Sequence, residues 1–135
     1  MRFWFIPVTV CAMSIALDAG AQNLSAGTTW KNESGSELYI AKIDASTGAM
    51  SGSYTNRVAS FGCRDEPFDA TGWITGEKIS FAVRWKNAKQ DCASITSWTG
   101  FLENGVLVAN WDLVFRSSAL KHHVIMRGSN FFEPK

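Results

Sequence analysis

The sequence predicts an all-β protein: one domain built as an eight-stranded antiparallel up-and-down β-barrel. Apolar and polar side chains alternate with a period of two along most of the chain after residue 22, which is typical of half-buried strands. Turn-type dipeptides recur at short intervals, and no stretch has the pattern of a long helix. Strands joined in this way protect both sheet edges by closing into a barrel; a β-sandwich is the main rival.

The individual strands are placed between the turn signals. Ser34-Gly35, Thr47-Gly48, Thr75-Gly76 and Asn104-Gly105 each separate two alternating segments, and Asn-Gly is the strongest signal for a type I′ hairpin. Thr71-Gly72 and Arg127-Gly128 are further dipeptides of the same type. The expected strands are 28–32, 36–44, 49–56, 67–74, 78–86, 93–101, 106–115 and 122–132.

Residues 1–21 are predicted to be a signal peptide rather than part of the barrel domain, 22–135. Arg2 precedes the apolar run WFIPVTVCAMSIAL, and Ala19-Gly20-Ala21 offers small residues for cleavage. The run is too short for a stable membrane span; a buried N-terminal helix is the alternative. We therefore expect a secreted or periplasmic protein that is soluble after cleavage near Ala21.

Composition excludes several classes of function. The chain has 135 residues and a formal net charge of +1, from 13 basic and 12 acidic side chains. This balance favours neither nucleic acid nor a charged membrane surface as a partner. Hydrophobic residues make up 46% and aromatic residues 13% of the chain, which is too apolar for a disordered protein.

Two cysteines remain after the predicted cleavage. Cys11 lies in the signal peptide, whereas Cys63 and Cys92 lie in the domain. In an oxidising compartment the two can pair, closing a loop of about 30 residues and contributing about 3–4 kcal/mol. Two separate buried thiols are the alternative.

Polar and aromatic side chains share one face of several predicted strands. The residues of common parity are Trp30 with Asn32 and Ser36; Tyr54 with Asn56; Ser94 with Thr96 and Trp98; and Trp111 with Leu113. Burying such hydroxyls and amides without partners costs about 1–3 kcal/mol each. The pattern therefore predicts a cavity for a compact, uncharged polar ring system. The alternative is that these faces point outward into solvent.

These same segments resemble the avidin and streptavidin family of biotin-binding proteins. Residues 27–36 (GTTWKNESGS) are similar to the family's opening motif, and residues 85–87 (WKN) with 94–100 (SITSWTG) are similar to its central block. Residues 110–113 (NWDL) and 128–132 (GSNFF) resemble its last two strands. The similarity covers residues 27–132 and implies an avidin-like barrel that binds biotin tightly as a ligand, with no catalysis and no cofactor.

The resemblance also implies roles for single residues. Asn32, Ser36 and Tyr54 correspond to the donors to the ureido oxygen of biotin. Asn56 and Asn130 correspond to the acceptors of the two ureido N–H groups, and the neutral amide of Asn130 implies a weaker hydrogen bond that is insensitive to acid.

The rest of the implied site surrounds the sulfur and the acyl chain. Thr96 corresponds to the partner of the thioether sulfur, and Ser94 to that of the carboxylate, with Ser60 as a further loop contact. The apolar box is formed by Trp85, Trp98, Trp111 and Leu113.

Two departures from the tetrameric avidins point to a dimer. The position of the Trp that a neighbouring subunit lends to the site is occupied by His122, so that lid is absent. Asn56-Arg57, Gly62-Cys63, Pro67-Phe68 and Cys92 instead resemble the dimeric branch typified by rhizavidin, in which a disulfide ties the loop over the ligand to a neighbouring strand. This resemblance implies a Cys63–Cys92 bridge and a homodimer.

Two other functions remain as rivals. A lipocalin-like carrier would bind an apolar ligand in an aliphatic cavity, and a secreted barrel-type protease inhibitor would have a packed interior and an active loop. Adjacent strand residues point to opposite faces, so His122-His123 is poor geometry for a metal, and no metal is expected.

Overall fold

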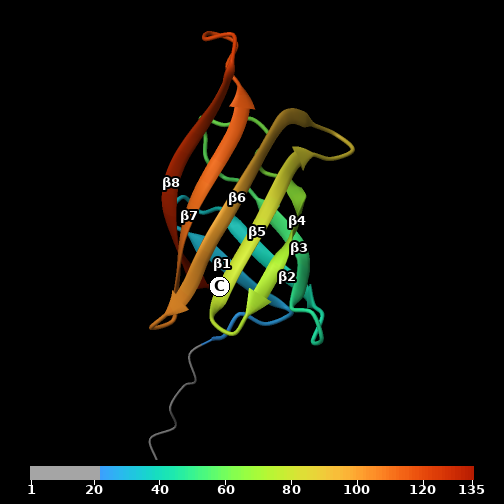
Figure 1. The fold of residues 1–135 in the computed structure, drawn as a ribbon, viewed down its shortest axis with the longest axis vertical. Coiled ribbons are helices and arrows are strands. Elements are labelled where there is room, and N and C mark those ends of the chain that lie inside the picture. Colours follow the sequence, from blue (N-terminus) through green and yellow to red (C-terminus); the bar gives the residue numbers. More distant parts are fainter. Residues whose placement is uncertain (1–21) are drawn as a thin grey trace, which may run out of the picture.

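The computed structural model describes residues 22–135 as a closed barrel of eight antiparallel strands in sequence order (Figure 1). The predicted fold class is confirmed; the predicted signal peptide, 1–21, lies outside the described residues. The strands are β1 (Thr28–Asn32), β2 (Glu37–Ile43), β3 (Ala49–Thr55), β4 (Pro67–Thr75), β5 (Lys78–Lys86), β6 (Asp91–Glu103), β7 (Val106–Arg116) and β8 (His123–Pro134).

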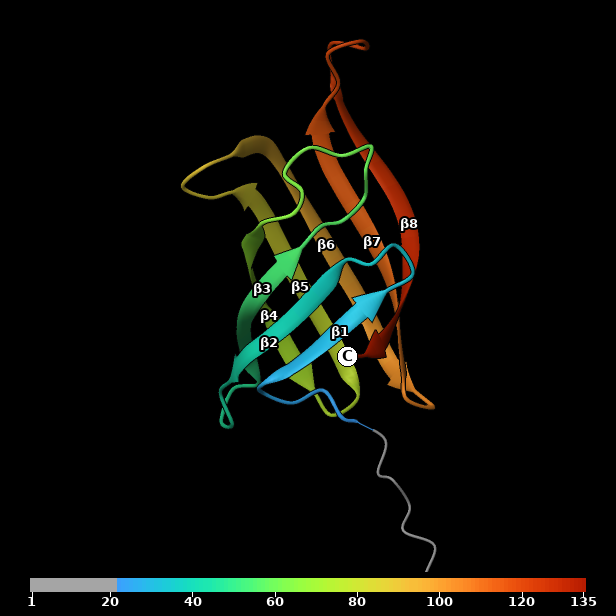
Figure 2. The ribbon, with the colours of Figure 1, turned by 180° about the vertical axis from the view of Figure 1, so that it is seen from behind.

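The barrel closes where the short strand β1 pairs with β8. Register pairs Asn32 with Phe132 and Trp30 with Pro134, while the other edge of β1 pairs with β2. Strands β5 to β8 form one broad wall, and β1 to β3 lie behind it (Figures 1 and 2). Full closure leaves none of the eight described strands with an unpaired edge, which removes the usual template for aggregation.

Alternation along the strands builds the core. Every second residue of β4 and β5 is buried, as the period-two pattern predicts. The largest fully buried side chains are aromatic, namely Trp30, Phe68, Phe81 and Phe132. Buried aromatic residues dominate core energetics because each removes about 150–250 Å² from water.

The predicted turns are only partly correct. Asn104 and Gly105 have φ values of 51° and 77° and connect β6 to β7, as a type I′ hairpin requires. Thr71-Gly72 and Arg127-Gly128 do not turn the chain, because both dipeptides lie inside strands, β4 and β8. At Gly128 the reason for glycine is space: an added Cβ would lie 2.4 Å from Cζ2 of Trp111.

Strand boundaries differ most from expectation in β6. This strand starts at Asp91 and ends at Glu103, so it is longer at both ends than the predicted 93–101. The start of β6 is irregular: its register with β5 shifts between Arg84 and Lys86, and Ala93 has a φ of 47°. In the described residues, no helix has the length and apolar character that a membrane span requires.

Candidate functional site

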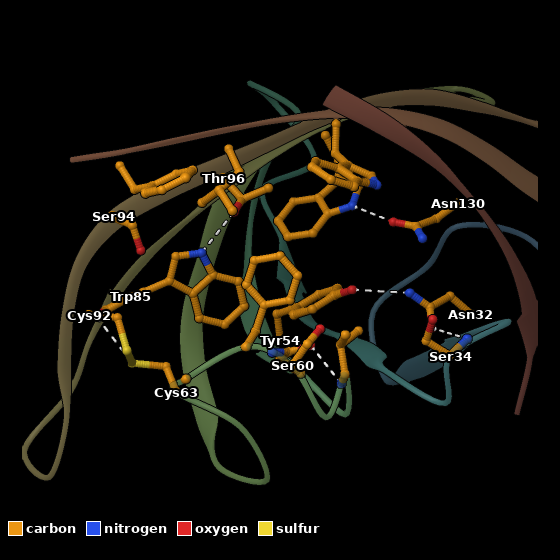
Figure 3. Close-up of a pocket in the computed structure, with 18 of the residues that line it drawn as sticks. Asn32, Ser34, Tyr54, Ser60, Cys63, Trp85, Cys92, Ser94, Thr96 and Asn130 are labelled. Atoms are coloured by element: carbon orange, nitrogen blue, oxygen red, sulfur yellow. Dashed lines mark hydrogen bonds between the residues drawn. A yellow bond between two sulfur atoms is a disulfide. The ribbon is translucent and has the colours of Figure 1, made fainter. Parts of the chain in front are cut away.

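A cavity of about 520 Å³ opens at one end of the barrel (Figure 3). The connections β1–β2 and β3–β4 contribute to its lining, together with strands β1, β3, β5, β6, β7 and β8. All of the site residues expected from the sequence line it except Ser36. The lining residues from that set are Asn32, Tyr54, Asn56, Ser60, Trp85, Ser94, Thr96, Trp98, Trp111, Leu113 and Asn130.

Buried polar residues gather at this end of the barrel. In the described part of the chain the buried polar residues are Asn32, Ser36, Asn56 and Thr96, each at most 8% exposed. No buried side-chain nitrogen or oxygen of residues 22–135 lacks a hydrogen-bond partner. The polar groups are therefore held in place before any ligand arrives, which lowers the cost of ordering them on binding.

Asn32 is oriented by its own turn. The backbone N–H groups of Ser34 and Ser36 both donate to Oδ1 of Asn32, at 3.0 Å and 2.9 Å. Nδ2 therefore points away from the turn and toward the cavity, where it donates to Oη of Tyr54 at 3.3 Å. The β1–β2 turn thus presents Asn32 as a donor to the cavity.

Tyr54 is the second donor at this end. Burial raises the pKa of its hydroxyl well above the usual range; the charge of Glu33 adds to the rise, and hydrogen bonds with Ser36 and Asn32 oppose it. The phenol therefore stays protonated at physiological pH. Because its oxygen accepts from Asn32, its proton can be directed at a ligand acceptor.

Ser36 lies behind the cavity wall rather than in it. Its residue is fully buried, and its Oγ accepts from the backbone N–H of Arg57 at 2.9 Å. The hydroxyl donates to Oδ1 of Asn56 at 3.4 Å, and that oxygen also accepts from the Val58 N–H at 3.0 Å. The acceptor atom of Asn56 is thus engaged on both sides by groups of the protein.

The aromatic wall is built from β3, β5 and β6. The Trp98 ring stacks on Phe81, with centroids 4.8 Å apart and an interplanar angle of 8°, and it lies 4.6 Å from the Tyr54 ring. Trp85 contacts Tyr54 edge-on at 5.9 Å and donates from Nε1 to Oγ1 of Thr96 at 2.8 Å. Since the Thr96 oxygen accepts that bond, its hydroxyl proton is available to the cavity.

Strand β7 supplies another apolar part of the wall. Trp111, Leu113 and Phe115 alternate inward, and all three line the cavity. Trp111 pairs with Gly128 in the β7–β8 register, so its indole lies over a position with no side chain. Ser94 lies near Trp85 and the Cys63–Cys92 bridge, away from Asn32 and Asn130 (Figure 3).

Asn130 is held between two partners. Its Oδ1 accepts from Nε1 of Trp98 at 3.0 Å, and its Nδ2 donates to Oε1 of Glu33 at 2.8 Å. The other carboxylate oxygen of Glu33 accepts from the Phe131 N–H at 3.0 Å. These contacts define the amide orientation: the oxygen faces Trp98 and the nitrogen faces the carboxylate.

The β3–β4 loop, residues 56–66, covers one side of the opening. The Cys63–Cys92 disulfide ties it to β6, as expected, with Cα atoms 6.3 Å apart. Asp65 donates its N–H to the Asn56 carbonyl at 2.8 Å and pairs with Arg57 at 3.1 Å. Cys63 and Asp65 have φ values of 52° and 63°, a conformation that non-glycine residues adopt only where their surroundings impose it.

Further cavity residues are absent from the sequence prediction. Phe115 could have been found by extending the alternation of Trp111 and Leu113, whereas the loop residues have no periodic signal. The lining residues not predicted are Glu33, Ser34, Val58, Phe61, Gly62, Phe115 and Ser129, besides the two cysteines of the bridge.

The chemistry of the cavity is that of binding. Its ionisable side chains are the Glu33 carboxylate, which is occupied by Asn130 and Phe131, and the protonated Tyr54. Within residues 22–135, no group of three or more His, Cys, Asp or Glu residues could hold a metal ion. The arrangement suits a ligand with an uncharged ring that carries acceptor and donor groups at the end near Asn32 and Asn130.

Fold and site together define a closed β-barrel with a ligand cavity built from aromatic walls and fixed polar groups. The Avidin family model matches residues 20–135. The chain belongs to the avidin family.

Two curated relatives are similar over most of the chain. Afifavidin from Afifella pfennigii is 34% identical over 109 residues, which is 78% of this chain and 66% of afifavidin, just under two thirds of its length. Hoefavidin from Hoeflea phototrophica is 31% identical over 121 residues, 82% of this chain and 74% of hoefavidin.

Solved structures agree with the fold. Apo shwanavidin is 41% identical with a TM-score of 0.75, covering 84% of this chain and 99% of that one. A rhizavidin–biotin complex is 34% identical with a TM-score of 0.75, covering 82% of this chain and 92% of that one.

Proposed function

We propose that this protein binds biotin non-covalently in the barrel cavity, with high affinity and without turnover. The observation that carries the proposal is the pair of oriented donors, Asn32 Nδ2 and the Tyr54 hydroxyl, at the inner end of an aromatic cavity. Family membership and the biotin complexes of rhizavidin and short afifavidin support the choice of ligand.

The ureido oxygen of biotin is assigned to Asn32, Tyr54 and Ser36. The first two line the cavity with their donors directed inward. Ser36 lies one layer behind, and its proton is directed to Asn56 at a long 3.4 Å. Rotation of the Ser36 hydroxyl toward the ligand would cost only this weak bond and would release the Asn56 oxygen.

The two ureido N–H groups are assigned to the oxygens of Asn56 and Asn130. Each amide oxygen has a second lone pair, so Asn130 can accept from the ligand while it accepts from Trp98. Thr96, whose oxygen accepts from Trp85, is assigned to the thioether sulfur.

The remaining contacts are with the ring system and the acyl chain. Ser94 and Ser60 are assigned to the carboxylate; both line the cavity, and Ser60 belongs to the disulfide-tied loop. The apolar box around the bicyclic ring and acyl chain is formed by Trp85, Trp98, Trp111 and Leu113.

A binding protein is favoured over an enzyme by the state of the polar groups. The hydroxyls and amides that line the inner end are engaged in hydrogen bonds with one another, and catalysis by attack needs a nucleophile beside a positioned base. Neither a cofactor nor a metal has a role in the proposed function.

The protein is proposed to act as a homodimer formed by the outer wall of β6, β7 and β8. Ile95, Val114 and Ile125 form one exposed apolar row across these strands, and a second row contains Phe101 and Phe131. An ion pair between Arg127 and Asp112, at 3.1 Å, lies between the rows.

A second copy is the occupant that fits this outer wall. An isologous interface, in which each copy presents the same patch, would bury both apolar rows and let each Arg127 approach the other copy's Asp112. Sedimentation or gel filtration of the wild type and of Ile125→Lys tests this, the expected result being a dimer that the substitution converts to monomer.

Export is proposed from the N-terminal segment alone. A cleavable signal peptide over residues 1–21 would place the protein outside the cytoplasm, where the Cys63–Cys92 bridge is stable. Mass spectrometry of the protein recovered from the periplasm or medium should find an N-terminus near Gln22.

Calorimetry of the purified protein with biotin tests the main proposal. Binding at one site per chain is expected, with a large rise in melting temperature, because a ligand present at 1,000 times its Kd stabilises by about 4.1 kcal/mol. Absence of both heat and thermal shift would rule out biotin. A fatty acid that binds instead would favour the lipocalin-like carrier, and protease inhibition would favour the inhibitor.

A further inference from the structure

Glu33 is the unexpected member of the site. It follows the last residue of β1 and lines the cavity, and among residues 22–135 it is the one carboxylate to do so. Each of its oxygens accepts one hydrogen bond from β8, from Asn130 Nδ2 at 2.8 Å and from Phe131 N at 3.0 Å. The residue thus joins two segments that are 97 positions apart in sequence.

Glu33 lies where β1 and β8 meet and close the barrel, here called the barrel seam, and this position explains its two hydrogen bonds to β8. The backbone ladder between β1 and β8 ends with the pair Asn32 and Phe132. At the next position the carboxylate accepts from the Phe131 N–H in place of a main-chain carbonyl. The two oxygens of the carboxylate accept from the Phe131 N–H and from the Asn130 amide at the same time. A main-chain carbonyl at the seam, with its single oxygen, does not do this.

The consequence for Asn130 is a defined amide orientation. A carboxylate accepts only, so the Asn130 nitrogen must face Glu33 and its oxygen must face Trp98 and the cavity. A charge-assisted hydrogen bond is stronger than a neutral one, and it polarises the next group in the chain, so the amide oxygen becomes a better acceptor.

We infer that Glu33 is a positioning residue for the ligand's N–H acceptor, supplying through Asn130 the negative charge that the neutral amide lacks. The inference rests on the proposed function for its ligand and extends it by one residue that the family resemblance does not assign. It also revises the expectation that the neutral Asn130 makes a weak hydrogen bond.

Exchange of the two functional groups tests the inference. Asn130→Asp alone places two carboxylates 2.8 Å apart and should weaken biotin binding by about a hundredfold. Glu33→Gln alone places the new amide nitrogen opposite one of the two donors, Asn130 Nδ2 or the Phe131 N–H. This substitution should weaken biotin binding by about tenfold. The double variant restores a donor opposite every acceptor, with the charge now on residue 130, and should bind within about threefold of wild type.

Glu37→Gln is the matched control. Glu37 is also a carboxylate near the barrel seam, paired with Lys135 at 2.7 Å, and it does not line the cavity. The same substitution there should leave biotin binding unchanged. Thermal unfolding of all variants in the absence of biotin separates loss of fold from loss of binding.

NMR of the ligand-free protein tests the hydrogen bonds between Glu33 and Asn130 and between Asn130 and Trp98 in the absence of biotin. The Asn130 side-chain amide and the Trp98 indole N–H should both be protected from exchange in the wild type, and both should lose protection in Glu33→Gln but not in Glu37→Gln. If wild-type protein failed to bind biotin while these signals behaved as described, the proposed function would be wrong and the positioning role would stand.

The opposite results overturn the inference. Additive losses in the double variant would mean that residues 33 and 130 act independently. A severe loss in Glu33→Gln together with a negligible loss in Asn130→Ala would mean that Glu33 itself accepts from the ligand. Unchanged Asn130 and Trp98 signals in Glu33→Gln would mean that the carboxylate does not orient the amide.

Discussion

Gly128 offers a sharp test of how the aromatic wall is built. A Cβ added at this position would lie 2.4 Å from Cζ2, 2.6 Å from Cε2 and 2.9 Å from Nε1 of Trp111. Carbon atoms in contact prefer about 3.5–4.0 Å, so Gly128→Ala requires the indole to move by about 1 Å. Strand β8 lies under the ring, and the open direction is the cavity.

The expected cost follows from that displacement. Overpacking of this kind destabilises by about 1–3 kcal/mol, and the free energy of biotin binding should fall by a similar amount because the ring enters the ligand volume. The corresponding loss of affinity is about 5- to 150-fold. The dissociation rate of labelled biotin and the melting temperature of the free protein measure the two effects.

A second variant shows whether Trp111 transmits the effect. In a Trp111→Phe background the smaller ring leaves room, so Gly128→Ala should cost markedly less there than in wild type. Glu133→Ala, at an exposed position of the same strand that does not line the cavity, should have little effect. A Gly128→Ala protein with unchanged affinity and melting temperature would show that the Trp111 ring is not displaced.

The remaining predictions concern the cavity wall, the bridge and the phenol. Trp111→Ala should weaken biotin binding severely in calorimetry, whereas Asp65→Ala, on the exposed side of its loop, should do little; equal effects would contradict the site assignment. Ellman titration of denatured, unreduced mature protein should find no free thiol, and replacing Cys63 and Cys92 by Ser should lower stability by about 3–4 kcal/mol. Burial raises the pKa of the Tyr54 hydroxyl above its value in the unfolded chain. The contribution of this group to the free energy of unfolding is therefore fully present below about pH 10 and is lost as the pH rises toward the folded pKa. A denaturation midpoint that already declines at pH 8 in the wild type, but not in Tyr54→Phe, would contradict this.

Much of the barrel could be predicted from local patterns. Alternation along Ile79, Phe81, Val83 and Trp85 determines which face of β5 is buried, and it does so without any knowledge of neighbouring strands. The Asn104-Gly105 turn is likewise local, because positive φ at both positions depends on these two residues. The turn-type dipeptide at Arg127-Gly128 shows the limit of such signals, since only the packed Trp111 ring explains the glycine.

The residues of the candidate site likewise divide into those that local patterns predict and those that they do not. Asn32, Tyr54, Thr96 and Trp98 could be assigned to the cavity because they share the inward parity of their strands. Phe61 could not, since it lies in a loop whose path has no period and is held by the Cys63–Cys92 bridge.

Local patterns predict the succession of strands, their inward faces and several of the cavity residues, because side-chain alternation is a property of the extended chain. How the polar groups share their hydrogen bonds depends instead on the folded barrel: Ser36 lies behind Asn56, and Glu33 holds Asn130 across the seam. Each of these pairings depends on the register in which distant strands meet, and register is set by the whole closed barrel rather than by any one segment.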